Sequence, residues 1–298
     1  MSLIRIDPAP DKGSYPSQPL LHLDALWIQV AGSVCNLACT HCFVSCGPDA
    51  DRHALMSRED VRGRVSEALA LGVQEIYFTG GEPFVNSEME VILEDTLQVA
   101  PCSVLTNGTL FTRRRIEFLR ALTLRSRFSL ELRVSLDGPD AASHDSFRGE
   151  GMFRRTLDGL GALSDAGLLP IVTVTQHSDE DPLAFRARYF EMLRAEGVAH
   201  PRLKVLPMFL LGRETQRTRE YAMTETLATL PANAFDVDRL QCGKSRAVTS
   251  QGVFVCPLLV DEPDARMGDS LASTTGPFEL RHGACHTCWV TGMTCGNG

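Results

Sequence analysis

The chain has 298 residues, of which 44% are hydrophobic and 22% are charged. This is the composition of an ordinary globular protein, and the length allows one large domain or a large domain with a small appendix. The formal net charge of -8 gives no electrostatic reason to expect nucleic acid or an anionic membrane as a partner. No signal-peptide core is present, and no stretch approaches the roughly 20 apolar residues that span a bilayer. We therefore expect a cytoplasmic protein with an N-terminal arm, 1–22.

The first expected strand, 24–30, is followed at once by the triplet Cys35-x3-Cys39-x2-Cys42. Three thiolates on one loop can hold three corners of a cubic iron–sulfur cluster, whereas a four-iron cluster needs four ligands. One iron would be left open, and a metal site with an open position is typically built to bind a substrate or cofactor. The alternative is a zinc site in which a nearby histidine completes the ligand set.

The region from about residue 23 to 208 alternates short β-like runs with longer helix-like runs, which is the pattern of a parallel sheet with crossover helices. We expect strands at 24–30, 75–78, 103–105, 129–136, 171–175 and 202–206. We expect helices at 57–71, 87–99, 112–122, 153–166 and 182–196. These six strands alternating with five helices predict an α/β fold.

The residues that follow the expected strands should lie together, because ligands gather at the carboxyl ends of parallel strands. After the second strand comes Gly80-Gly81-Glu82-Pro83. Its two glycines let the backbone approach a ligand closely, and its carboxylate can accept hydrogen bonds from an ammonium group. An ordinary strand-to-helix turn is the alternative. The later strand ends carry Thr106, Asn107, Ser135, Asp137, Gln176 and His177.

The β–α alternation stops after residue 211. Residues 213–241 read as a polar connector, and 244–256 as a hairpin. The tail from residue 261 is turn-rich and too poor in apolar residues to fold alone, so a metal or packing against the main domain must hold it. Two cysteines lie outside both the triplet and the later group of five cysteines near the C-terminal end. Cys46 is expected to be a free loop thiol and Cys102 a small buried hydrophobic residue.

The order of these motifs resembles the radical S-adenosylmethionine (radical SAM) enzymes over about residues 23–212. It is carried by Cys35-x3-Cys39-x2-Cys42, Gly80-Gly81-Glu82-Pro83, Ser135-Leu136-Asp137-Gly138-Pro139, His144-Asp145 and Arg148-Gly149. The resemblance implies a partial (β/α)6 TIM-like barrel and a [4Fe-4S] cluster on the three cysteines. The amine and carboxylate of S-adenosylmethionine would chelate the open iron. Reductive cleavage would then give a 5′-deoxyadenosyl radical that abstracts a hydrogen atom from the substrate.

The resemblance also assigns cofactor contacts. Phe43 would pack near the adenine, the Gly80-Gly81-Glu82-Pro83 turn would bind the methionyl amine, and Arg148 would pair with the methionyl carboxylate. A core phenylalanine and a surface arginine are the alternatives for Phe43 and Arg148. His144 and Asp145 are expected to shape a loop. The candidates for the ribose hydroxyls are Thr106, Asn107, Ser135 and Asp137.

A second group of five cysteines follows the connector, and its spacing is similar to the extension called SPASM or its shorter form, Twitch. Such extensions hold auxiliary iron–sulfur clusters. The last cysteines of a full SPASM domain are missing, so the resemblance implies one auxiliary [4Fe-4S] cluster in a domain at 242–298. A zinc site with four thiolates is the alternative. The candidate ligands are Cys242, Cys256, Cys285 and Cys288, which fit the Twitch arrangement best, and Cys295.

The resemblance leaves two substrate classes open. One is a peptide side chain or backbone position, changed by oxidation, cross-linking or epimerisation. The other is a small metabolite such as an alcohol, a nucleotide or a tetrapyrrole-like molecule. The core begins near residue 24, so we expect any peptide-recognition domain to be a separate protein, and flavodoxin or ferredoxin to be the reductant. The non-enzymatic alternative is an iron–sulfur electron carrier or redox sensor.

The two cysteine groups predict the metal content of the protein. Two four-iron clusters require about eight iron atoms per chain, whereas one cluster beside a zinc site requires about four. We expect about eight in anaerobically reconstituted protein, measured by elemental analysis together with acid-labile sulfide. A colourless, iron-free preparation would contradict both cluster assignments.

Overall fold

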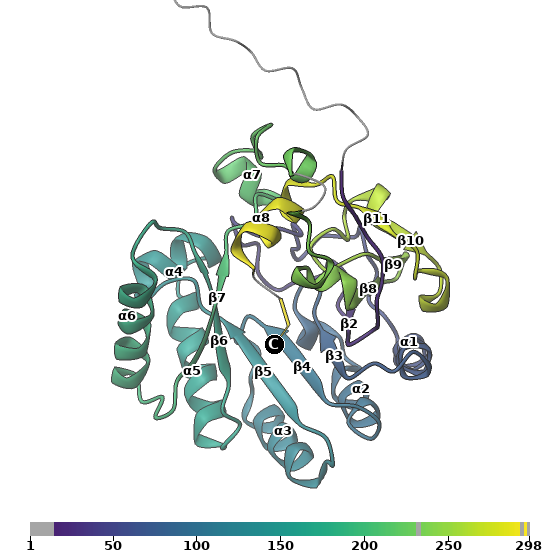
Figure 1. The fold of residues 1–298 in the computed structure, drawn as a ribbon. Coiled ribbons are helices and arrows are strands. Elements are labelled where there is room, and N and C mark those ends of the chain that lie inside the picture. The colour runs from purple at the N-terminus through teal and green to yellow at the C-terminus, as the bar shows by residue number, and fades with distance from the viewer. Residues whose placement is uncertain (1–14, 231–233, 293–294, 297–298) are drawn as a thin grey trace, which may run out of the picture.

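The computed structural model describes residues 15–230, 234–292 and 295–296. Its centre is one curved nine-stranded sheet, with helices packed on the convex side (Figure 1). The seven strands from β8 to β7 are mutually parallel, while β9 and β10 continue the sheet in antiparallel pairing. In spatial order the strands are β10 (Arg266–Gly268), β9 (Gly252–Phe254), β8 (Ser245–Thr249), β2 (Ala25–Ile28), β3 (Glu75–Phe78), β4 (Cys102–Thr106), β5 (Leu130–Ser135), β6 (Ile171–Gln176) and β7 (Arg202–Pro207).

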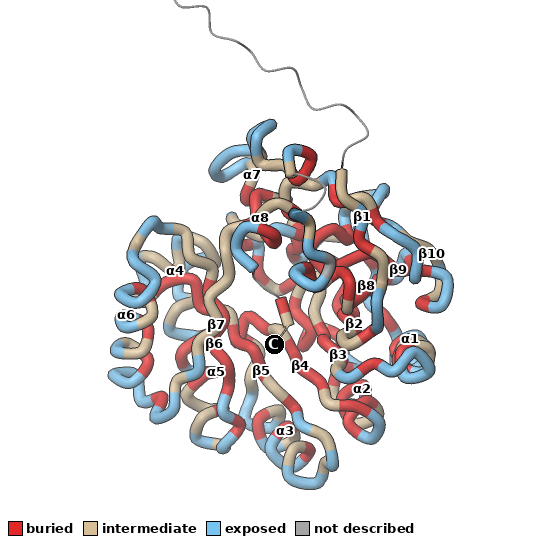
Figure 2. The backbone as a smooth tube through the Cα atoms, viewed as in Figure 1, coloured by how far each residue is buried: buried red, intermediate tan, exposed pale blue. Residues whose placement is uncertain are grey.

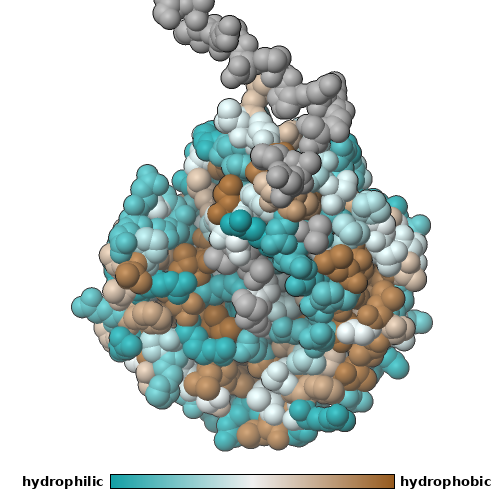
Figure 3. All heavy atoms as spheres, viewed as in Figure 1, coloured by the Kyte–Doolittle hydropathy of each residue, from teal (hydrophilic) through white to brown (hydrophobic). Residues whose placement is uncertain are grey.

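Helices cover the outer face of the sheet, and α7 and α8 lie in the C-terminal part (Figure 1). The backbone is buried mainly along the strands and exposed on the outer helix faces (Figure 2). Hydrophilic residues are interspersed with smaller hydrophobic patches over the face shown in Figure 3. None of the helices in the described part of the chain combines the length and apolar character needed to cross a bilayer. The helices are α1 (Arg58–Ala70), α2 (Met89–Thr96), α3 (Arg113–Arg125), α4 (Ala141–Arg148), α5 (Met152–Asp165), α6 (Pro182–Ala195), α7 (Arg213–Arg217) and α8 (Gly283–Thr291).

The expected α/β fold with a partial barrel is confirmed. All six expected strands and all five expected helices are present, with ends shifted by no more than three residues. Local signals fix several of these ends: α1 starts at a capping box in which Ser57 and Asp60 bond each other's backbone N–H. The sheet keeps two free edges, β10 and β7, among the described residues, so it remains open.

Three helices, α4, α7 and α8, were not predicted from the sequence, and α4 corrects a specific expectation. His144 and Asp145 were expected to shape a loop, and this expectation was wrong, because both lie inside α4. Asp140 caps the helix by accepting a hydrogen bond from the Ser143 N–H, and His144 is completely buried. The segment is rich in residues of low helix propensity, so tertiary burial decides its conformation.

The hairpin expected at 244–256 is present and is part of the main sheet. Its first strand, β8, pairs in parallel with β2, placing Ala25 opposite Ser245 and Ile28 opposite Val248. A separate two-stranded sheet joins β1 (Ser17–Gln18) to β11 (Phe278–Glu279). The cysteine-rich segment is therefore continuous with the barrel sheet.

Side chains alternate between the two faces of each central strand. In β5, Leu132 and Val134 belong to the apolar core beneath the helices, whereas Arg133 and Ser135 point into a cavity on the concave side. The cavity is bounded by the concave face of the sheet, the cysteine loop after β2 and residues 257–258, and we call it the central cavity. Its lining is mainly apolar and carries a few polar and charged side chains, which is typical of a site that binds a ligand.

The turn after β3 holds the cysteine loop in place. The Gly81 N–H donates to the Gly32 carbonyl (2.9 Å), and the Glu82 N–H donates to the Val34 carbonyl (3.0 Å). Gly80 has a φ of +116°, which favours glycine. A Cβ atom on Gly81 would lie 1.9 Å from the Val34 carbonyl oxygen, so only glycine fits beside this backbone.

We therefore expect Gly81→Ala to displace the cysteine loop, because the clash is with backbone. The variant should lose about 1–3 kcal/mol of stability and should retain less iron after reconstitution. The control is Gly63→Ala in α1, where an added Cβ meets no atom within 4 Å. This control variant should retain as much iron as the wild type, and its stability should be unchanged or slightly higher. Thermal melts and iron analysis of both variants provide the comparison, and full iron retention by Gly81→Ala would refute this role of the turn.

Candidate active site

The three cysteines of the first group face the central cavity, as does Cys46. All four thiols are free. Backbone N–H groups point at two of the sulfurs: Leu37 N lies 3.4 Å from Cys35 Sγ, and Cys46 N lies 3.3 Å from Cys42 Sγ. Hydrogen bonds of this kind favour a thiolate. The loop therefore presents sulfur ligands that are oriented before any metal arrives.

The buried environment otherwise opposes thiolate formation. Burial raises the pKa of Cys35 to about 12, whereas a hydrogen bond from the Cys46 side chain lowers the pKa of Cys42 to about 5. A coordinated metal deprotonates a thiol outright, which removes this cost. The donor set thus fits a metal cluster held by Cys35, Cys39 and Cys42.

Arg213, at the start of α7, holds the cysteine loop in place by hydrogen bonds to its backbone. Its Nε donates to the Cys39 carbonyl (2.7 Å), and its Nη2 donates to the Cys46 carbonyl (2.6 Å). Its own backbone N–H donates to the Cys42 carbonyl (3.0 Å). The sequence analysis placed residue 213 in the connector, and no local motif reveals its role, because the contact spans more than 160 positions.

Glu82 lies beneath the wall of the central cavity and is completely buried. Its carboxylate accepts hydrogen bonds from the Thr106 hydroxyl (2.8 Å), the Asn107 N–H (2.7 Å) and the Phe84 N–H (3.1 Å). Burial raises the pKa of Glu82, although these three bonds act in the opposite direction. In this structure the carboxylate joins the turn after β3 to the end of β4.

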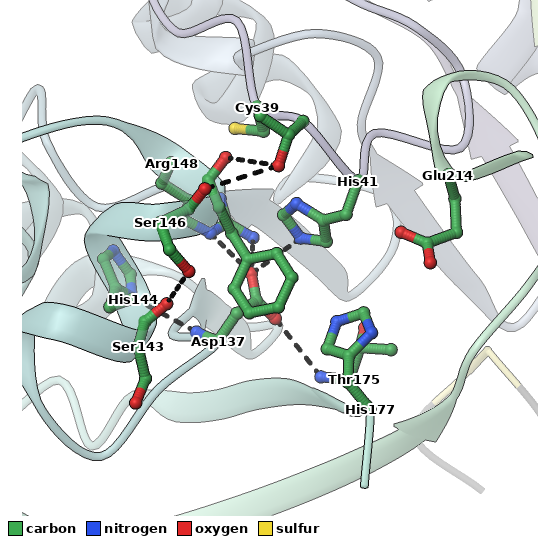
Figure 4. Close-up of polar contacts among 12 residues, drawn as sticks. Cys39, His41, Asp137, Ser143, His144, Ser146, Arg148, Thr175, His177 and Glu214 are labelled. Atoms are coloured by element: carbon green, nitrogen blue, oxygen red, sulfur yellow. Dashed lines mark hydrogen bonds and ion pairs between the residues drawn. The ribbon is translucent and has the colours of Figure 1, made fainter. Parts of the chain in front are cut away.

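Asp137 is the centre of a charged cluster at the end of β5 (Figure 4). Its Oδ2 accepts from Arg148 Nε (2.6 Å) and lies 2.9 Å from His41 Nε2, while its Oδ1 accepts from the Thr175 N–H (3.2 Å). Burial opposes ionisation, but the charges of Arg148 and His41 outweigh it and hold the pKa of Asp137 well below its usual range. A fixed carboxylate therefore faces the cavity next to the cysteine loop.

His144 supports this carboxylate from behind. Its Nδ1 accepts a hydrogen bond from the Asp137 N–H (3.2 Å), so the ring is in the neutral form. Burial and the nearby charge of Arg148 lower its pKa to about 4.

The rim of the cavity carries residues to which the sequence analysis gave no role (Figure 4). His177 stacks on Phe147 with ring centroids 4.6 Å apart, and the Arg217 guanidinium lies over the Phe147 ring, 5.0 Å from its centroid. Buried Glu214 accepts from Arg217 Nη2 (2.6 Å). His177 and Glu214 line the central cavity. The position of His177 at a strand end was the only signal in the sequence.

Most of the predicted cofactor residues meet at the central cavity. Glu82 and Pro83 are buried and are not among the residues that line it. The predicted residues that do line it are Cys35, Cys39, Cys42, Phe43, Gly80, Gly81, Thr106, Asn107, Ser135, Asp137 and Arg148.

The C-terminal cysteines divide into two places. Burial raises the pKa of Cys242 to about 11 and that of Cys285 to about 12, which again suits metal ligands better than free thiolates. Cys295 lines the central cavity instead, with its N–H donating to Gln241 Oε1 (2.6 Å). The four cysteines that share a second, smaller cavity are Cys242, Cys256, Cys285 and Cys288.

Comparison with known proteins identifies the family. Residues 30–185, more than half of the chain, match the model of the Radical SAM superfamily. The chain belongs to this superfamily. The predicted likeness to radical SAM enzymes is thereby confirmed.

Two curated relatives show the range of similar proteins. The chain is 34% identical over 141 residues to an AdoMet-dependent heme synthase of Nitratidesulfovibrio vulgaris, covering 45% of this chain and 35% of that protein. It is 32% identical over 143 residues to the subtilosin biosynthesis protein AlbA of Bacillus subtilis, covering 47% of this chain and 31% of that protein. The chain spans about a third of the length of these relatives.

A solved structure shares the fold. The chain is similar to SuiB of Streptococcus suis bound to S-adenosylmethionine, with a TM-score of 0.63 and 16% identity. The match covers 82% of this chain and 62% of that one. It extends beyond the family model into the C-terminal part.

The buried His144 predicts a pH dependence of stability. Its pKa is about 4 in the folded protein and about 6.5 when unfolded, so the unfolded chain binds more protons between these values. Stability should therefore fall as the pH drops through this window, and His144 should contribute about 2 kcal/mol of the loss between pH 7 and pH 5.

His144→Asn keeps a hydrogen-bond acceptor but cannot titrate, so the difference in unfolding free energy between pH 7 and pH 5 should shrink by about that amount. Urea unfolding at both pH values measures it. His22→Asn, at an exposed position, is the control. Identical pH profiles for wild type and His144→Asn would show that His144 is not held neutral.

Proposed function

We propose that this protein is an enzyme that cleaves S-adenosylmethionine reductively and abstracts a hydrogen atom from its substrate. The observation that carries the proposal is the convergence of three buried thiols, the Gly80-Gly81 backbone and the Asp137–Arg148 pair on one cavity. A [4Fe-4S] cluster on Cys35, Cys39 and Cys42 would supply the electron for the cleavage.

The walls of the cavity offer suitable partners for the cofactor. Gly80 and Gly81 would let backbone groups approach the methionyl part, and Phe43 would pack near the adenine. Arg148 is fixed by Asp137 and therefore ready to pair with a carboxylate without a loss of side-chain entropy. Glu82, Pro83, Thr106, Asn107, Ser135 and Asp137 complete the proposed cofactor set.

The second cavity is the proposed auxiliary cluster site. Four buried cysteines without disulfide bonds share it: two flank the β8–β9 hairpin and two lie in α8. A cluster there would hold the hydrophobically poor tail against the sheet and could accept an electron from the substrate radical. Cys295 is the fifth candidate ligand; it lines the central cavity and is close enough to Cys288 to act on it electrostatically.

Peptides are the substrate class that we favour. The support is the fold shared with SuiB, which has been solved with the precursor peptide SuiA, and the sequence similarity to AlbA, a bacteriocin biosynthesis protein. A small metabolite is the second candidate, because AdoMet-dependent heme synthases and a GTP 3′,8-cyclase are relatives of similar identity. A separate recognition protein and a flavodoxin- or ferredoxin-like reductant are the proposed partners.

Formation of 5′-deoxyadenosine tests the proposal directly. Reconstituted protein incubated with dithionite and S-adenosylmethionine should release it, and chromatography detects it. Cys39→Ala should abolish the product, because one cluster ligand is missing. Cys102→Ala is the matched control, since Cys102 is buried in the core beneath the helices and should be dispensable. Product at the wild-type rate from Cys39→Ala would contradict the assignment, and no product from the wild type would favour an electron carrier or sensor.

A further inference from the structure

The central cavity holds a buried positive charge at its lower end, in β5. Arg133 is 1% exposed and lines the cavity. Its Nη1 donates to the Cys295 carbonyl (2.5 Å), and its Nε is 3.4 Å from the Thr173 hydroxyl. Its Nη2 is buried and has no hydrogen-bond partner among the described residues. Each of the two protein partners is a neutral oxygen.

A second cation stands near Arg133 on the concave face. Lys204 in β7 is in register with Thr173 in β6, the residue that Arg133 contacts. Lys204 donates to the Gly296 carbonyl, again a neutral oxygen. Burial, reinforced by the charge of Arg133, lowers the pKa of Lys204 to about 8. The strands thus present two cations to the same end of the barrel.

Among the residues that the structure describes, no carboxylate lies within 4.0 Å of either cation. Glu75 acts on both cations and Glu131 on Arg133, but from beyond ion-pairing distance. Arg148, in the same cavity, differs because its buried charge is compensated by an ion pair with Asp137 at 2.6 Å. Burying a charge without a counter-ion is costly. An unpaired buried guanidinium that borders a cavity is therefore a site for an anion.

A second buried arginine, Arg246, lies in a different environment. Arg246 is also buried and also has an unpartnered Nη2. Its Nη1, however, donates to the Cys242 carbonyl, so it lies beside the proposed auxiliary cluster, whose thiolates would supply negative charge. It does not line the central cavity. Arg133 differs because the space in front of it is the cavity itself.

We propose that Arg133, assisted by Lys204, anchors an anionic group of the substrate, a carboxylate or a phosphate. The inference rests on the proposed function, because it assigns this anion to the molecule that is to be modified. Along β5, Arg133 precedes Asp137 by four residues, or about 13 Å. The anion is thus held at the base of the barrel, and the rest of the substrate extends toward the cysteine loop. Arg133 acts as a substrate-binding residue that sets specificity.

Calorimetric titration of the full-length, reconstituted protein saturated with S-adenosylmethionine tests this site. The probes are N-acetylglycine, its neutral counterpart N-acetylglycinamide, and inorganic phosphate. Saturating cofactor prevents the probes from binding at its carboxylate site. One anion should bind at a single site, and N-acetylglycinamide should not. Binding of N-acetylglycine identifies a carboxylate substrate, and binding of phosphate alone identifies a phosphorylated one.

Substitutions assign the binding to Arg133. Arg133→Met should weaken the affinity for the anion at least tenfold. Arg133→Lys keeps the charge but not the planar guanidinium, so its affinity should lie between those of Arg133→Met and the wild type. Arg246→Met is the matched control for loss of a buried arginine and should not change the affinity. Iron content and thermal melts report on folding, and Arg133→Lys serves alone if the methionine variant does not fold.

Three results would overturn the site: no saturable binding of either anion, equal binding of N-acetylglycinamide, or unchanged affinity in Arg133→Met. The titration needs no cleavage of S-adenosylmethionine. A protein that binds the anion through Arg133 but forms no 5′-deoxyadenosine would contradict the proposed function and not the anion site. A protein that forms 5′-deoxyadenosine but does not bind the anion through Arg133 would contradict only the anion site.

Discussion

The parallel pairing of β2 on both of its edges is the constraint on which the site depends. On one side β2 pairs with β3, whose Gly80-Gly81 turn then bonds the start of the cysteine loop. On the other side it pairs with β8, the strand that carries the second cysteine group into the same sheet. One short buried strand therefore fixes the first thiols, the turn beside them and the C-terminal extension relative to one another. The energy behind this arrangement is the burial of its apolar side chains together with two complete ladders of hydrogen bonds.

The distribution of charge inside the barrel follows a simple electrostatic rule. At the top, Asp137 is surrounded by Arg148, His41 and a backbone N–H, so that its negative charge is fully compensated. At the base, the hydrogen-bond acceptors of Arg133 and Lys204 in the described part of the chain are neutral oxygens. A buried carboxylate that is paired with cations, as Asp137 is, needs no further ligand. Two buried cations that contact neutral oxygens are stabilised when an anion binds beside them. The concave face is thus electrostatically complete where we place the cofactor and incomplete where we place the substrate.

The C-terminal tail completes the cavity by contacts that are distant in sequence. The carbonyl groups of Cys295 and Gly296 accept from Arg133 and Lys204, and Cys295 N–H donates to Gln241. The tail therefore joins the two strands that carry the cations. This arrangement explains why Cys295 is separated from the four cysteines of the second cavity although it lies only seven positions after Cys288.

Much of this molecule is determined by local sequence. Alternating β and α periodicity predicted six of the strands and five of the helices, and the spacing of Cys35, Cys39 and Cys42 predicted the first metal site, which stays a prediction. The glycine pair after β3 was informative because a positive φ and a close backbone approach exclude other residues. Tertiary structure alone decided the helix at Ala141–Arg148, the contacts of Arg213 with the cysteine loop, the burial of Glu82 beneath the cavity wall and the unpaired state of Arg133. These features depend on pairs of residues far apart in the chain, and neither propensity nor spacing reports which charges the folded interior brings together or leaves alone.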